Sequence, residues 1–133
     1  MKSFRGLEVW NLSIDLTTQI YEVTSYYPRE EIYGLTSQMR RAAVSTSSNL
    51  AEGSARGMYR DFRKFVRMAQ GSNSELQTQL IISRRLGFGN VESCERAEAL
   101  SQQVGRILSG LSKYLSDRVR KESLPTTNNQ QLT

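Results

Sequence analysis

The chain has 133 residues, and its 18 Lys and Arg residues exceed its 13 Asp and Glu residues by five. This length fits one domain. No histidine is present, and Cys94 is the one cysteine. The lack of histidine excludes His-dependent catalytic triads, imidazole general bases and Glu-x-x-His di-iron sites, and a single thiol cannot complete a zinc site. We therefore predict a non-enzymatic protein with no catalytic residues, no metal and no cofactor.

The sequence also bears on where the protein acts. No run of eighteen apolar residues occurs, so no membrane-spanning helix is expected. The first ten residues, MKSFRGLEVW, lack the apolar segment and cleavage site of a signal peptide. A single cysteine cannot form an internal disulfide. These features predict a cytoplasmic protein with no membrane partner.

The first predicted helix, from about Leu7 to Tyr26, carries two apolar stripes. Pro28 ends it, because the residue before a proline avoids helical angles. The main stripe contains Val9, Leu12, Leu16, Ile20, Val23 and Tyr27, and the second contains Trp10, Ile14 and Tyr21. One intramolecular core needs only the first stripe. We therefore expect the second to contact another subunit of a homo-oligomer, with the first and second helices forming much of the interface.

The second predicted helix, from about Leu35 to Ala55, has an unusual polar stripe. Gln38, Ser45, Asn49 and Glu52 follow one another at steps of 7, 4 and 3, which places them on one face. A solvated face is one interpretation. We favour a polar network buried in the bundle or in a subunit interface, because apolar residues flank this stripe and it contains no Lys or Arg.

Two further helices complete the expected fold. The third runs from about Tyr59 to Leu86 with a second polar stripe, and Gly87 and Gly89 stop it. Asn90 caps the fourth, which runs to about Lys121. Cys94 lies on its apolar stripe and is expected to be a core residue. Short connections favour an all-α fold, an antiparallel up-down four-helix bundle over residues 1–122, followed by a disordered tail over 123–133.

The two polar stripes are expected to meet. We predict that Glu52 and Glu75 lie partly buried on facing helices, each held by an arginine or an amide, because an unpaired buried carboxylate is too costly. A hydrolase that uses these two carboxylates as acid and base is a remote alternative. The full predicted structural polar network is Gln38, Arg40, Arg41, Ser45, Asn49, Glu52, Ser72 and Glu75.

The positive charge gathers in the middle of the chain. Residues 34–85 carry nine basic and three acidic residues. Five basic residues there recur at steps of 4, 3, 1 and 3, which brings them to one face across a turn. That spacing suits phosphates along a nucleic-acid strand, although a solvated surface is the plainer interpretation. These candidate nucleic-acid-binding residues are Arg56, Arg60, Arg63, Lys64 and Arg67.

Three segments, residues 7–28, 33–57 and 71–88, carry a resemblance to a known family. GLTSQMRRAAVS followed by NLAEG is the most specific part. The chain resembles the four-helix-bundle proteins first noticed as reading frames inside intervening sequences of bacterial large-subunit rRNA genes. It departs from their pattern at Thr46, where proline is usual, and at Asn73, where an apolar residue is usual. The family's signature falls on Gly34, Leu35, Gln38, Arg40, Arg41, Ala42, Ser45, Asn49, Glu52, Gly53, Gly71, Ser72 and Glu75.

The resemblance implies a homopentamer of up-down bundles. It also implies kinship with the accessory variability determinant of diversity-generating retroelements, a bundle that partners a reverse transcriptase and binds nucleic acid. Two functions remain open at this point. One is a nucleic-acid-binding oligomer that serves as an accessory or chaperone for structured RNA or for a reverse transcriptase. The other is a protein-interaction scaffold that binds no nucleic acid.

Overall fold

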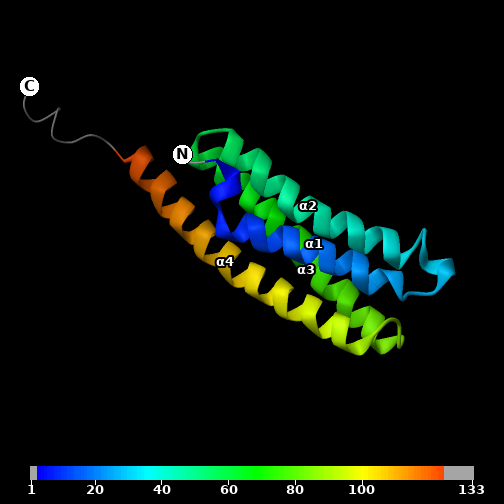
Figure 1. Ribbon diagram of the computed structural model, residues 1–133. Coiled ribbons are helices and arrows are strands. Elements are labelled where there is room, and N and C mark those ends of the chain that lie inside the picture. The colour runs from blue at the N-terminus through cyan, green and yellow to red at the C-terminus, as the bar shows by residue number, and fades with distance from the viewer. Residues whose placement is uncertain (1–2, 125–133) are drawn as a thin grey trace, which may run out of the picture.

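The computed structural model describes residues 3–124, which form an elongated bundle of four helices (Figure 1). The chain reverses direction at every connection, so consecutive helices are antiparallel, and no strand occurs in this range. This confirms the predicted all-α fold, with helix ends within two residues of those expected. The helices are α1 (Glu8–Ser25), α2 (Leu35–Ala55), α3 (Tyr59–Arg85) and α4 (Val91–Ser123), with 3-10 turns η1 (Phe4–Gly6) and η2 (Arg29–Glu31).

The core lies on the bundle axis and is shared by all four helices. Helix α1 packs against α2 and α4, and α3 packs against the same two helices, so the four form a closed square. Burying one Leu or Ile side chain contributes about 1.5–3 kcal/mol, so this shared core is the main source of stability. Its largest fully buried side chains include Leu16, Ile20, Met39, Leu50, Leu76, Leu80, Leu108 and Leu115.

The helix ends follow the local signals of the sequence. Helix α1 ends at Ser25, shortly before Pro28, and η2 occupies part of the loop that follows. Gly87 and Gly89 adopt φ values of +74° and +83° after α3, a conformation that favours glycine. The Asn90 side chain accepts a hydrogen bond of 3.0 Å from the Ser93 amide, which confirms the predicted cap of α4.

Helices α2 and α3 approach closely near the turn that joins them. A Cβ atom built on Gly53 would lie 2.5 Å from the Phe65 Cβ atom, too short for any real contact. Gly57 in the turn adopts a φ of +79°. The two glycines therefore allow α3 to fold back directly onto the end of α2.

Thr46 and Asn73, the two departures from the family pattern, are both buried and hydrogen-bonded. The Thr46 hydroxyl donates to the Ala42 carbonyl at 3.0 Å, and α2 continues through this position. Asn73 donates through Nδ2 to the Ser101 carbonyl at 3.0 Å and accepts from the Ser101 hydroxyl at 2.8 Å. An apolar side chain is therefore replaced here by a satisfied polar pair between α3 and α4.

The environment of Cys94 makes its thiol unreactive. The residue is buried, and Sγ lies 3.5 Å from Glu98 Oε1, to which the thiol donates. Burial raises the pKa of the Cys94 thiol to about 11, and the hydrogen bond to Glu98 and its negative charge act in the same direction. The expected role of Cys94 as a core residue agrees with this position.

The predicted disordered tail begins one residue too early, because α4 continues to Ser123. The remainder of that prediction, residues 125–133, lies outside the described residues.

We predict that Gly53→Ala destabilises the bundle by about 1–3 kcal/mol, because the new methyl group must displace Phe65. Gly110→Ala is the matched control, since its Cβ would meet no atom within 4 Å. There the change should stabilise α4 by about 0.5–1 kcal/mol. Urea unfolding followed by circular dichroism measures both values. Equal effects at the two sites would contradict the close approach.

We also predict slow alkylation of Cys94 by iodoacetamide at pH 8. The thiolate is the reacting species, and a thiol with a pKa of about 11 holds very little of it at that pH. The rate in the folded protein should be more than about tenfold below that of free cysteine. Mass spectrometry follows the reaction, and unfolding in urea should restore the normal rate. A normal rate before unfolding would show that Cys94 is accessible and ionised.

Candidate functional site

The net charge lies in one half of the bundle. This half, the basic end, comprises residues 3–16, 46–72 and 107–124, and it carries ten basic and six acidic residues. Residues 17–45 and 73–106 form the other half, with seven of each. The basic end is where α1 and α3 begin and where α2 and α4 finish (Figure 1). The antiparallel fold therefore concentrates a charge excess that comes from distant parts of the sequence.

All five predicted nucleic-acid-binding residues lie at the basic end. Four of them occupy the first turns of α3, and Arg56 lies in the turn before it. Arg63 is half-buried and the other four are exposed. The Arg56 guanidinium lies 5.0 Å from the centroid of the Phe65 ring, a cation–π contact that orients it. Within residues 3–124 none of the five forms a salt bridge, so their charges face solvent without an acidic partner.

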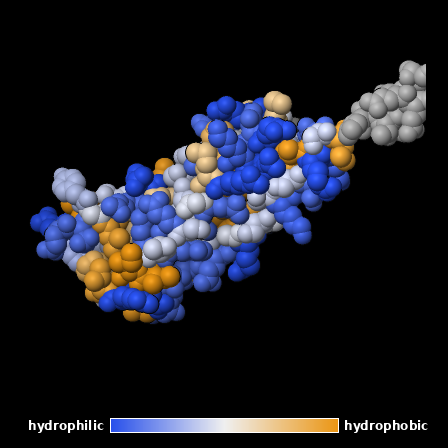
Figure 2. Space-filling view, turned by 180° about the vertical axis from the view of Figure 1, so that it is seen from behind, coloured by the Kyte–Doolittle hydropathy of each residue, from blue (hydrophilic) through white to orange (hydrophobic). Residues whose placement is uncertain are grey.

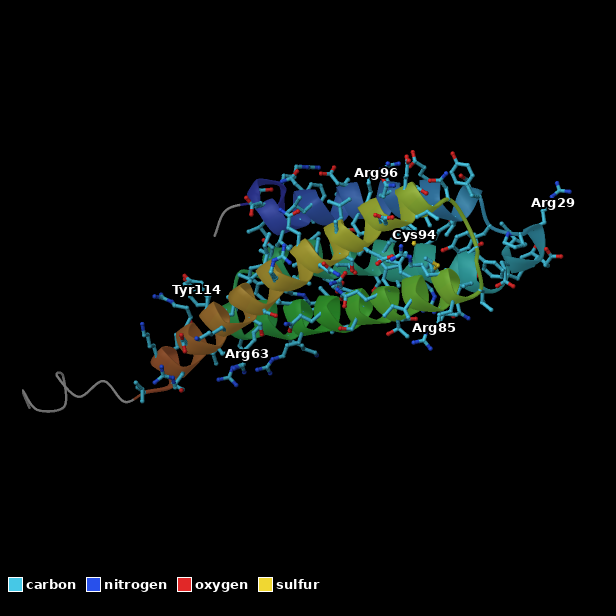
Figure 3. The ribbon with its side chains drawn as sticks, turned by 90° about the horizontal axis from the view of Figure 1, so that it is seen from below. Arg29, Arg63, Arg85, Cys94, Arg96 and Tyr114 are labelled. Atoms are coloured by element: carbon cyan, nitrogen blue, oxygen red, sulfur yellow. The ribbon has the colours of Figure 1, made fainter. Side chains whose placement is uncertain are left out.

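Helix α4 adds residues that sequence reasoning did not include in the site. The Arg118 guanidinium lies 4.9 Å from the Tyr59 ring centroid, and the Tyr59 and Tyr114 rings meet edge to face with centroids 6.5 Å apart. Figure 3 shows Arg63 of α3 and Tyr114 of α4 at the same end of the bundle. The sequence shows that basic residues lie near the C-terminal end of α4, but the closeness of Arg118 to Tyr59 is a tertiary feature.

Part of the predicted polar network joins α2 and α3. The Ser72 hydroxyl donates to the Ser45 hydroxyl at 3.0 Å. Asn49 donates through Nδ2 to the carbonyl and the hydroxyl of Ser45, at 2.8 and 3.0 Å. All three residues are half-buried. This cluster fixes the register of the two helices at mid-length.

Within the single chain, the two carboxylates are not buried as predicted, and burial in a subunit interface stays a prediction. Glu52 is exposed and forms no salt bridge within residues 3–124. The Glu75 side chain is 46% exposed and lies 3.9 Å from Arg41, whose side chain is 72% exposed, and it also accepts from Gln79. Gln38 is exposed as well. The inward face of α2 is filled instead by Met39, Ala43, Thr46 and Leu50.

Arg40 has a different partner from the one expected. Its Nε donates to the Thr24 hydroxyl at 2.9 Å, and its guanidinium lies 4.5 Å from the Tyr21 ring centroid. It therefore links α2 to α1 and holds neither carboxylate.

Glu52 and Glu75 are not brought together. Ser45 and Ser72 are in contact, and Glu52 lies seven residues beyond Ser45 while Glu75 lies three beyond Ser72 in the antiparallel helix. At 1.5 Å per residue, the carboxylates are about 15 Å apart along the bundle. Paired acid and base carboxylates, as in glycosidases, are about 5–9.5 Å apart. This arrangement does not supply the remote hydrolase alternative with its catalytic pair.

Comparison with known proteins then places the chain. A family model described as "23S rRNA-intervening sequence protein" matches residues 5–110. The chain belongs to this family. A crystal structure from the S23 ribosomal protein family of Bacteroides thetaiotaomicron, a protein of unknown function, is similar with a TM-score of 0.70 and 18% identity. The match covers 79% of this chain and 98% of that one. A comparison with curated proteins found no match.

The region matched by the 23S rRNA-intervening sequence family model covers only part of the candidate site. The matched region ends at residue 110, so Lys113, Tyr114 and Arg118 lie beyond it. Gly53, a signature position, is explained by the close approach to Phe65. The similar crystal structure supports the bundle fold alone.

Two further findings concern residues 3–124 of this family member. No helix in this range has an apolar stretch long enough to cross a membrane. No group of three or more His, Cys, Asp or Glu residues in the same range is arranged to hold a metal ion.

We predict that Glu52→Ala changes the free energy of unfolding by less than about 0.5 kcal/mol, as is usual for an exposed residue without a partner. Thermal unfolding of both proteins at equal concentration tests this. A loss of about 2 kcal/mol or more would contradict it and would place a partner of Glu52 on a neighbouring molecule.

Proposed function

We propose that the protein is a non-enzymatic, cytoplasmic, nucleic-acid-binding oligomer. In this proposal it serves as an accessory or chaperone for structured RNA or for a reverse transcriptase, and the basic end binds the phosphates. The observation that carries the proposal is the charge excess in one half of the bundle, with five cationic side chains free of acidic partners. The family's association with rRNA intervening sequences is consistent with an RNA ligand.

The residue types suit phosphate recognition. Four of the five cations on α3 and its preceding turn are arginines, whose planar guanidinium groups form paired hydrogen bonds with phosphate oxygens. Side chains three or four residues apart on a helix lie about 5–6 Å apart, so several can contact one strand. Such contacts are independent of base sequence and weaken as salt rises.

Exposed apolar side chains on α1 and α2 support assembly. Ile14, Tyr21 and Val44 are 37, 46 and 42% exposed. The first two belong to the second apolar stripe of α1, whose third member, Trp10, is partly buried against the core. We propose that this surface joins the subunits of a homo-oligomer, with a pentamer as the state that the resemblance implies. Five copies would carry a net charge of about +25, a field strong enough to attract a polyanion.

A protein-interaction scaffold is the second candidate, and one surface favours it. Figure 2 shows apolar residues gathered at the end of the bundle away from the last turns of α4. The exposed apolar side chains around the α3–α4 turn are Ile81, Ile82, Leu86 and Val91. A contiguous exposed apolar surface of this kind is typical of protein contacts. The scaffold candidate uses this end of the bundle, whereas nucleic-acid binding uses the other.

We predict that the double variant Arg60→Glu/Arg63→Glu weakens RNA binding by about tenfold or more. In a plot of the logarithm of affinity against the logarithm of salt concentration, the slope should also become shallower, by about one for each phosphate that the variant no longer binds. The matched control is Arg29→Glu/Arg85→Glu, which changes the net charge by the same amount. Both arginines are exposed, lie in the half of the bundle with balanced charge, and form no salt bridge within residues 3–124. Fluorescence anisotropy at several salt concentrations measures both.

Light scattering should show the same oligomer for wild type and both variants. Equal weakening of RNA binding in the two double variants would mean that overall charge, and not the basic end, attracts RNA. If the wild-type protein retains no RNA at low salt, the proposal is overturned in favour of the scaffold.

A further inference from the structure

A polar groove runs between α3 and α4 beside the basic end. Its volume is about 410 Å³, within the range of about 300–1,000 Å³ found for small-molecule sites. Its lining includes no acidic residue and is rich in amides, unlike the apolar lining of most such sites. The lining residues include Gln70, Asn73 and Gln77 on α3 and Gln102, Gly105 and Arg106 on α4.

Because Gly105 has no side chain, the amides of Asn73 and Gln77 can lie close to the α4 backbone at the floor of the groove. A Cβ atom there would lie 3.2 Å from Asn73 Nδ2 and 3.7 Å from Gln77 Nε2. The two amides cross this space to the Ser101 carbonyl, at 3.0 Å from Asn73 and 3.4 Å from Gln77. The floor of the groove is therefore a fixed polar surface.

The upper walls keep their hydrogen-bonding groups free. Within residues 3–124, the side chains of Gln70, Gln102 and Arg106 form no hydrogen bond or salt bridge. An amide offers both donors and an acceptor, and Arg106 adds a positive charge. This combination suits a ligand that has polar edges and a negative charge.

The groove continues into the basic end. On α3, Arg63 and Arg67 precede Gln70 and Gln77 at helical spacing, so all four share one face. On α4, Gln102, Arg106, Ser109 and Lys113 share a face in the same way. Because the helices are antiparallel, Arg63 and Lys113 lie toward the same end. From position 102 to position 113 the α4 wall is about 16 Å long.

We propose that this groove binds single-stranded nucleic acid, with one unpaired base among the amides and neighbouring phosphates on Arg63, Arg67, Arg106 and Lys113. Amide side chains recognise base edges, and those edges are exposed only when the base is unpaired. A duplex keeps its bases paired and cannot insert one between two helices. This inference rests on the proposed function and adds a preference for single strands.

The test compares Ser109→Phe, which fills the groove with an uncharged side chain, with Gln103→Phe, another exposed position on α4 that lies outside the lining. The probes are an oligouridine of about 12 nucleotides and an RNA duplex of equal length. Wild type should bind the single strand about tenfold more tightly than the duplex. Ser109→Phe should bind the single strand about tenfold more weakly and the duplex as tightly as wild type does. Gln103→Phe should behave as wild type.

A second variant, Gln70→Ala/Gln102→Ala, removes the free amides without adding bulk. Like Ser109→Phe, it should bind the single strand more weakly than wild type does. The inference is overturned if wild type binds both probes equally, or if Ser109→Phe and the amide variant both bind oligouridine like wild type. In either case binding by the basic end would stand. Absence of all RNA binding by wild type would overturn the proposed function itself and this inference with it.

Discussion

Helices α2 and α3 meet closely at Gly53, where the absence of a side chain lets the Phe65 side chain pack against the α2 backbone. The turn between them is short, so this contact sets how α3 leaves α2 and how both lie against the remaining helices. Phe65 also supports Arg56, whose guanidinium lies over its ring. A larger residue at position 53 would separate the helices and would move the first turns of α3, which carry the candidate binding residues.

The antiparallel topology then determines where charge gathers. The start of α3 and the end of α4 are about sixty residues apart in sequence and adjacent in the bundle, where Tyr59 contacts Tyr114 and supports Arg118. Like charges repel, so gathering cations in one half of the bundle lowers its stability when no negative charge is bound there. A phosphate-bearing ligand would relieve this repulsion. The other half has balanced charge, with acidic partners for Arg84 and Arg96.

Buried polar contacts fix the alignment of the helices and shape the groove. The half-buried Ser45–Ser72 contact aligns α2 with α3, and the buried Asn73–Ser101 pair aligns α3 with α4. Each group is satisfied, so neither contact leaves an unpaired polar atom in the interior. The Asn73 pair also forms the floor beneath the free amides of the groove. One polar residue at an apolar position thus has both a structural role and a role in the proposed site.

Sequence alone determined the helices, their ends and the bundle, because apolar spacing, Asn90 as a cap and the glycines near 87–89 act through local geometry. It also located the basic residues of α3, since their spacing along one helix places them on one face. It did not predict that Gln38 and Glu52 are exposed in the single chain while Ser45 and Asn49 are half-buried, because periodicity shows which residues share a face and cannot show which way that face turns. Rotation of α2 is set by packing of Met39, Thr46 and Leu50 against the other helices. Only the tertiary structure brought Arg118 to Tyr59 and Gly105 to the amides of the groove, because both depend on contacts between helices distant in sequence.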